Sequence, residues 1–223
     1  MNEREYRAFE FEVRAEESEE HGHYLTGVPI VFGQETHIGG WLEYDEVIER
    51  SALENCDLRD VRFLVGHNAS GIPLARSRNN NEHSTMQMTI EDDGLHIRVD
   101  LDTENNAEAK TLYSATQRGD ISGMSFAFTV DGYAWERLED EDSVPLRRIT
   151  SIKRVYEVSA VAFPAYEGTS LEAKSENAET LDSVRASLES AKAELAAKRA
   201  AENEAARRDA AIARLKKFRE VIG

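Results

Sequence analysis

A change in composition near residue 166 divides the chain into two parts that must fold differently. Residues 180–223 are rich in Ala, Glu, Lys and Arg, and they contain no Gly or Pro before the final Gly223. Apolar residues in this part recur with a spacing of three and four, first at Leu181, Val184, Leu188, Ala191 and Leu195 and again at Ala211, Leu215, Phe218 and Ile222. The pattern predicts one long helix with a narrow apolar seam, typical of a weak coiled coil or of packing that depends on a partner.

The remainder of the chain reads as many short strands with one or two helices. Residues 86–90 and 95–101 flank the turn-forming sequence Asp92-Asp93-Gly94, which predicts a β-hairpin. Residues 105–118 have helical apolar spacing, and Gly119 is placed to end that helix. This mixture predicts an α+β fold with a small barrel or sandwich core flanked by helices.

These patterns also suggest where the parts of the chain begin and end. We expect a folded body at 1–166, a polar linker at 167–179 and a helical, coiled-coil-like extension at 180–223. The chain has 223 residues, which is enough for one sizeable core plus such an extension.

The charge of the chain is uneven and excludes one class of partner. The net charge is −16, and residues 1–170 hold 16 Lys and Arg against 33 Asp and Glu. Nucleic-acid binding through this body is not expected, because phosphate contacts need clustered cations. Cys56 is the single cysteine, so no internal disulfide forms, which fits a reducing cytoplasm. No apolar run reaches membrane-spanning length and the N-terminus has no signal-peptide pattern, so we expect a soluble protein.

The run GDISGMSFAF at residues 119–128 is the first candidate for chemistry. In a strand, side chains alternate between faces, so Ser125 shares one face with Gly123 and Ala127. These small neighbours leave space above its hydroxyl, and a nucleophile needs such space because a carbonyl must approach it closely. Ser122 is the rival serine, and the same alternation places it on the other face. From the strand alone, a structural role for Ser125 is the simpler interpretation.

Two further runs carry residues that complete a hydrolytic site. The run RFLVGHN at residues 62–68 places His67 at the end of an apolar segment. The run YEVSAVAFP at residues 156–164 carries Glu157, a lone carboxylate in another apolar segment.

Taken together and in this order, the three runs resemble the prohead serine proteases of tailed bacteriophages, of the HK97 type. The resemblance rests on Gly66-His67-Asn68, on residues 119–128 and on EVSAVAFPA at residues 157–165, and it covers roughly residues 24–166. The chain departs from the family pattern at Asn68, where the family often has Asp, at a position that is not expected to do chemistry.

The resemblance implies a fold, a chemistry and a setting. The fold would be the small closed antiparallel β-barrel of the herpesvirus assembly proteases, flanked by helices. Ser125 would attack the scissile carbonyl, His67 would act as general base and then acid, and Glu157 would orient His67. Herpesvirus enzymes use a second histidine in the third role, but this chain has no histidine after His96, so an acid is needed there.

The same resemblance implies what the protein acts on and where. Its substrates would be segments of the phage major capsid protein or scaffold, and the chain itself, cut during maturation inside the procapsid in the host cytoplasm. The C-terminal helix would bind another copy of itself or a helical segment of a scaffold or capsid subunit. We expect no cofactor, no metal, no nucleic acid and no membrane.

Some alternatives remain open at this point. The rival function is a catalytically inactive scaffold or assembly protein that acts through its C-terminal coiled coil. Ser159 shares a face with Glu157 and is a possible helper or substitute for it. The oxyanion hole could come from Arg147, Arg148 or the backbone at Gly123-Met124.

Two other candidate sites are weaker. Cys56 stands beside charged residues that disfavour a reactive thiolate. His21 and His23 offer only two metal ligands with no further Cys or His nearby, which makes a poor site.

Overall fold

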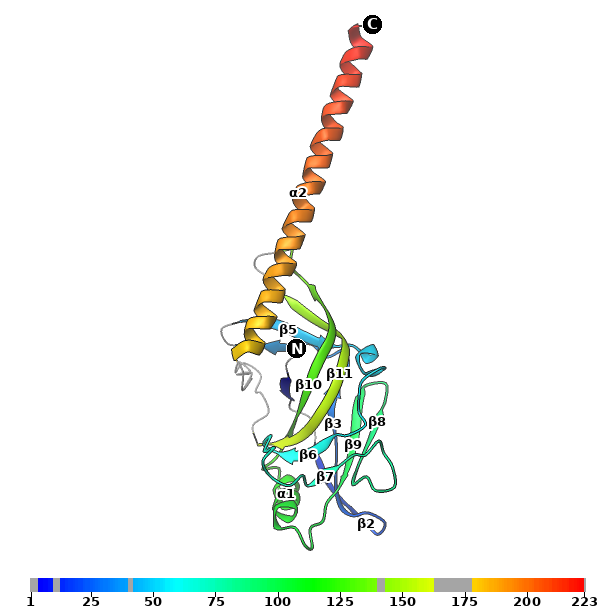
Figure 1. Ribbon diagram of the computed structural model, residues 1–223, viewed down its shortest axis with the longest axis vertical. Helices are drawn as coiled ribbons and strands as arrows, with labels where there is room; N and C mark the ends of the chain where they lie inside the picture. Colours follow the sequence, from blue (N-terminus) through cyan, green and yellow to red (C-terminus); the bar gives the residue numbers. More distant parts are fainter. Residues whose placement is uncertain (1–3, 10–12, 40–41, 140–142, 163–177, 223) are drawn as a thin grey trace.

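The computed structural model describes residues 4–9, 13–39, 42–139, 143–162 and 178–222. Within these ranges the chain forms a body of two β-sheets with short helices, and one long helix extends away from it (Figure 1). The α+β class predicted from the sequence is confirmed.

The larger sheet is built around two long antiparallel strands, β10 (Gly123–Glu136) and β11 (Leu146–Val161). β1 (Glu5–Phe9) pairs antiparallel with β10 on the side away from β11. Two strands pair parallel with β11, β5 (Tyr44–Ile48) near its beginning and β6 (Arg62–Val65) near its end. β4 (Thr36–Ile38) pairs with β5, and β7 (Ala75–Arg76) pairs with β6.

The smaller sheet has the order β2 (Arg14–Ser18), β3 (Gly22–Val31), β9 (Gly94–Asp100), β8 (Met86–Ile90). The predicted hairpin is confirmed as β8–β9. The pairing of β3 with β9 shifts register between Gly27 and Ile30, around Pro29, which has no N–H to donate. Glycine is required at position 94, because a Cβ there would lie 2.2 Å from the carbonyl oxygen of Ile30.

Two short helical elements complete the body. A 3₁₀ turn, η1 (Arg50–Leu53), follows β5, and α1 (Ala107–Gln117) precedes the serine strand. Asn106 begins α1 by accepting hydrogen bonds from the N–H groups of Glu108 and Ala109. Gly119 follows the helix with φ of 79°, as expected for a residue that ends a helix in the left-handed region.

The core lies between the two sheets and is filled by alternate residues of the long strands. Met124, Phe126 and Phe128 of β10 are fully buried there together with Leu25 and Ile97 of the smaller sheet. This confirms the expected alternation, with Ser125 and Ala127 on the other face of β10. The pairings among the described strands form two sheets and do not run in a closed ring, so the barrel implied by the resemblance is not confirmed.

The predicted C-terminal helix is α2 (Ala178–Ile222), which begins two residues before the expected position. Its first turns pack on the body, where Val184 joins Ile38 and Tyr44 in a small buried cluster. Leu188 is 2% exposed, and the indole N–H of Trp135 donates to Ser187 Oγ at 3.1 Å. The expected linker lies almost wholly outside the described residues. Among the described residues, no helix combines the length and the apolar character needed to cross a membrane.

Candidate active site

Three neighbouring strands bring the candidate residues onto one face of the larger sheet. Ser125 on β10 lies directly opposite Ser159 on β11, and Ala127 lies directly opposite Glu157. Residues directly opposite each other in a sheet share a face, so Ser125, Ser159 and Glu157 form one patch on the side away from the Phe126 core. Ala127 and Ser125 are each 1% exposed, so the open space expected above the Ser125 hydroxyl is not found in the structure.

His67 reaches the same patch from the end of β6. Leu64 and Val65 pair with Ser159 and Ala160 of β11, and the chain then turns sharply at Gly66 and His67. Both turn residues have positive φ, 57° for Gly66 and 61° for His67. A positive φ is uncommon for a residue with a side chain, and such strain is found at functional sites where the surroundings enforce it. Here the His67 N–H donates to Ser159 Oγ at 3.2 Å, which holds the turn against β11.

The side chains of His67 and Glu157 are in direct contact. His67 Nδ1 lies 2.6 Å from Glu157 Oε1, and the other carboxylate oxygen of Glu157 accepts a hydrogen bond from Ser159 Oγ at 2.6 Å. When Nδ1 carries the proton donated to Glu157, Nε2 is left as the acceptor that a general base needs. The His67 side chain is 30% exposed and that of Glu157 10%, so the imidazole is accessible while the carboxylate is mostly shielded.

Ser125 is next to this pair but is not bonded to it. Its hydroxyl donates to the backbone carbonyl of Arg7 at 2.8 Å, and the residue is 1% exposed. Ser159, which contacts both His67 and Glu157, lies directly opposite Ser125 on the neighbouring strand. Rotation about the Cα–Cβ bond of Ser125 would free the hydroxyl from β1. Ser122, the rival serine, is exposed and precedes the strand.

Tyr6 is a residue of this patch that the sequence reasoning missed. It pairs with Ala127 across β1 and β10, and its ring lies edge-on to His67 with centroids 5.0 Å apart. Tyr6 lies outside the three runs that carry the candidate residues, so nothing local in the sequence singled it out. Tyr6 comes from β1 and His67 from the end of β6, so the two rings reach the patch from opposite sides of the β10–β11 pair.

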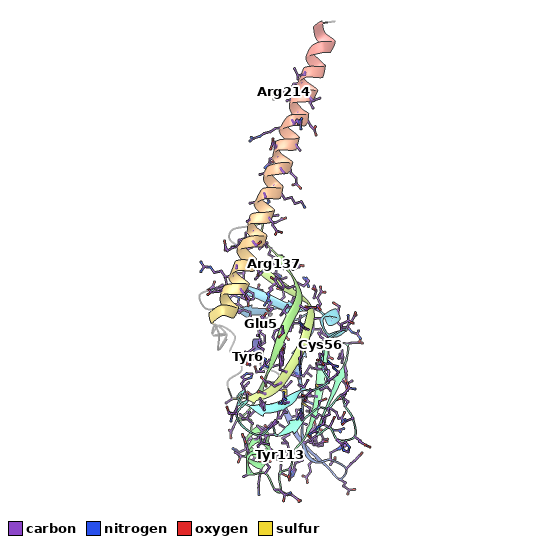
Figure 2. All side chains as sticks on the ribbon, viewed as in Figure 1. Glu5, Tyr6, Cys56, Tyr113, Arg137 and Arg214 are labelled. Carbon is purple, nitrogen blue, oxygen red and sulfur yellow. The ribbon has the colours of Figure 1, made fainter. Side chains whose placement is uncertain are left out.

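The other face of β1 is held by a buried cluster of four charges, Glu5, Arg7, Glu46 and Arg147. Arg7 donates to Glu46 at 2.6 and 2.8 Å and to Glu5 at 2.7 Å, and Arg147 donates to both carboxylates at 2.6 to 3.0 Å. Burial raises the pKa of Glu5, but Arg147 and Arg7 outweigh it and hold that pKa at about 2. Figure 2 labels Glu5 and Tyr6 on β1, from which they point to opposite faces of the sheet.

Ion pairs engage both arginines that were candidates for the oxyanion hole. Arg147 is engaged with Glu5 and Glu46, and Arg148 donates to Glu136 at 2.7 and 2.9 Å. Both arginines lie near the beginning of β11, whereas Glu157 and Ser159 lie near its end. Of the three sources considered from the sequence, the backbone at Gly123 and Met124 is the one adjacent to Ser125.

The two weaker candidate sites have the following surroundings. Burial raises the pKa of the Cys56 thiol to about 12, which disfavours the thiolate. His23 Nδ1 lies 2.6 Å from Thr103 Oγ1, and His21 stands beside Glu20. Elsewhere, Glu91, Asp93 and His96 bring ligand atoms within 4.8 Å of one another, but exposed acidic groups are common without a metal.

Comparison with known proteins gives one finding for this chain. Residues 9–183 match the family model described as caudovirus prohead serine protease, which takes in all three candidate residues. No curated protein and no solved structure matches the chain.

Proposed function

The chain belongs to the caudovirus prohead serine protease family, and from this premise we propose that it is a serine endopeptidase acting through Ser125, His67 and Glu157. The family implies a serine protease of capsid maturation. The observation that carries the assignment of residues is the 2.6 Å contact between His67 Nδ1 and Glu157 Oε1, on the same sheet face as Ser125.

The proposed reaction is acyl transfer in two steps. The Ser125 hydroxyl leaves the Arg7 carbonyl, gives its proton to His67 Nε2 and attacks the scissile carbonyl carbon. His67 then passes this proton to the leaving amine, and a peptide acyl group remains bonded to Ser125 Oγ. Water, deprotonated by His67, releases the acyl group. Glu157 holds the imidazole with its proton on Nδ1 and stabilises the imidazolium that forms in each step.

Two supporting roles follow from the contacts of the patch. Ser159 fixes the Glu157 carboxylate and the His67 backbone with the same hydroxyl, so we assign it as a positioning residue. Backbone N–H groups at Gly123 and Met124 are proposed to stabilise the oxyanion, because a tetrahedral intermediate on Ser125 forms beside them.

The proposed substrates are extended segments of the major capsid protein or scaffold, together with the chain itself, inside the procapsid. Self-cleavage is proposed within the polar linker expected at residues 167–179 or within the C-terminal helix. The substrates in this proposal come from the family, and the position of self-cleavage comes from the polar composition of the expected linker.

Mass spectrometry of the purified chain, alone and with the capsid protein of the same phage, tests the proposed function. We expect defined fragments of the capsid protein and of the chain, all of which disappear with Ser125→Ala. Ser122→Ala is the matched control and should give the wild-type fragments. Unchanged masses for the wild-type chain with its capsid protein would favour the rival function, an inactive assembly protein.

A further inference from the structure

The apolar residues of α2 do not form one continuous seam. Val184 and Leu188 face the body and are 5% and 2% exposed. Leu215 follows Leu188 by 27 residues, which is about seven and a half turns of an α-helix. Half a turn of offset places Leu215 on the face opposite to Leu188, while Ile212, 28 residues after Val184, lies about 80° around the helix from Val184. The distal third of α2 therefore presents a second seam, which the body contact does not use.

This second seam is open in the structure. Ile212 is 45% exposed and Leu215 is 67% exposed, and they are among the few large apolar residues with such exposure in the described chain. The distal part of α2 extends well away from the body (Figure 1), and Figure 2 shows Arg214 on this free-standing part. An isolated helix with so little buried surface gains stability from a partner that covers its apolar seam.

Charge identifies what kind of partner fits. Residues 205–222 hold six Lys and Arg against two Asp and Glu, the reverse of the balance in residues 1–170. Arg207 and Arg214 are seven residues apart and both lie to one side of Leu215, about a quarter turn from it. Both are exposed. In a helix pair, charged residues beside the seam select the partner by attraction and repulsion.

We infer that residues 205–215 are a docking surface for an acidic amphipathic helix of another protein. Antiparallel pairing of two copies of this segment would bring the Arg207 and Arg214 flanks against each other, which is unfavourable. Duplex nucleic acid would pair with the arginines but would leave the seam of Ile212 and Leu215 uncovered. An acidic helix with its own apolar seam satisfies both features. The inference does not depend on the proposed catalytic residues.

Binding to synthetic helices tests this inference directly. The protein is the full chain carrying Ser125→Ala, which prevents self-cleavage. The probe is a fluorescent peptide of about three heptads with Leu and Ile along one seam and Glu beside it. The comparison probes are a peptide with the same seam and Lys beside it, a scrambled peptide of the acidic composition, and a mixed-sequence DNA duplex. We expect the acidic helix to bind at least about tenfold more tightly than each of the others.

Two pairs of substitutions locate the surface on α2. Ile212→Gln with Leu215→Gln should weaken binding of the acidic helix about tenfold or more. Arg207→Gln with Arg214→Gln should also weaken it and reduce its dependence on salt. The matched control is Ala206→Glu with Ala213→Glu, which changes the net charge equally on the opposite face and should leave affinity within about twofold. Circular dichroism checks that every variant keeps its helix.

Four results would overturn the inference. The scrambled or Lys-flanked peptide binds as tightly as the acidic helix. The control pair weakens binding as much as the arginine pair does. The DNA duplex binds more tightly than the peptide. Sedimentation shows a dimer of the full chain that Ile212→Gln with Leu215→Gln dissociates, which would identify a second copy as the occupant.

Discussion

His67 Nδ1 and Glu157 Oε1 lie 2.6 Å apart, although 90 residues separate them in the chain. The contact arises because β6 pairs in parallel with the end of β11, which sets the turn after β6 against the carboxylate. A histidine held in this way by an acid keeps its proton on Nδ1, which leaves Nε2 able to accept a proton. The pairing of these two strands is therefore what converts three scattered residues into a candidate catalytic site.

Replacing Glu157 by Gln should lower kcat by about two to four orders of magnitude, because an amide neither selects the tautomer as firmly nor stabilises the imidazolium. Binding of substrate should change little, so KM should stay near its wild-type value. Steady-state kinetics on a peptide cut from the capsid protein gives both constants. Wild-type kcat for Glu157→Gln would remove the acid from the mechanism and leave a Ser125–His67 dyad.

Ser159→Ala should lower kcat about tenfold to a hundredfold with little change in KM, since the Glu157 carboxylate and the His67 turn both lose the same hydroxyl. Ser159→Thr keeps the hydroxyl, and β-branched residues suit a strand, so it should recover much of the loss. Thermal unfolding of both variants separates positioning from stability. A Thr variant that is stable yet as slow as the Ala variant would contradict this role.

Glu5 should make the protein sensitive to acid. Its pKa of about 2 in the folded state lies below the ordinary value of 4.5, so its contribution is fully present above about pH 4.5. That contribution, about 3 kcal/mol, is lost as the pH falls through 2.

Glu5→Gln should cost about 3 to 5 kcal/mol near pH 7, because Arg7 and Arg147 are then left with one buried carboxylate. Urea unfolding at several pH values measures both effects.

The role of Glu5 is tested by comparing how the free energy of unfolding depends on pH in wild type and in Glu5→Gln. Between pH 4.5 and 2 the free energy of unfolding of wild type should fall more steeply than that of Glu5→Gln. Parallel curves for the two proteins would mean that Glu5 is not held as the ion pairs indicate.

The first turns of α2 should contribute to the stability of the body, whereas the distal part of α2 should not. Deleting residues 167–223 removes Val184 from its cluster with Ile38 and Tyr44 and also removes the buried Leu188, which should cost about 3 kcal/mol. Deleting residues 201–223 leaves those contacts intact and should keep wild-type stability and peptide hydrolysis. Chemical unfolding of the two truncated chains checks this, and equal stability of both would place α2 outside the folded unit.

The elements with strong local signals could be predicted from the sequence. Gly119 marks the end of α1, the turn at Asp92-Asp93-Gly94 marks a hairpin, and the alternation around Ser125 gives the faces of β10. These depend on near neighbours in the chain. The three candidate residues could also be named, because the family resemblance supplied their roles.

Long-range pairing is what the sequence could not supply. Nothing local indicates that β1 lies beside β10, so neither the contact of Tyr6 with His67 nor the hydrogen bond from Ser125 to Arg7 could be expected. Arg147 appeared available for catalysis, yet folding places it among Glu5, Arg7 and Glu46. The sequence also could not show that α2 has two separate seams, because this follows from the packing of Val184 and Leu188 against the body.

The central claim is that Ser125 is the nucleophile, activated by His67. Labelling with a fluorophosphonate followed by peptide mapping tests it most directly, because the reagent forms a covalent bond with an activated serine. The account predicts one adduct, on Ser125, formed quickly in wild type and lost with His67→Ala. An adduct on Ser122 or Ser159 in an active preparation, or labelling of Ser125 that does not change when His67 is replaced, would contradict it.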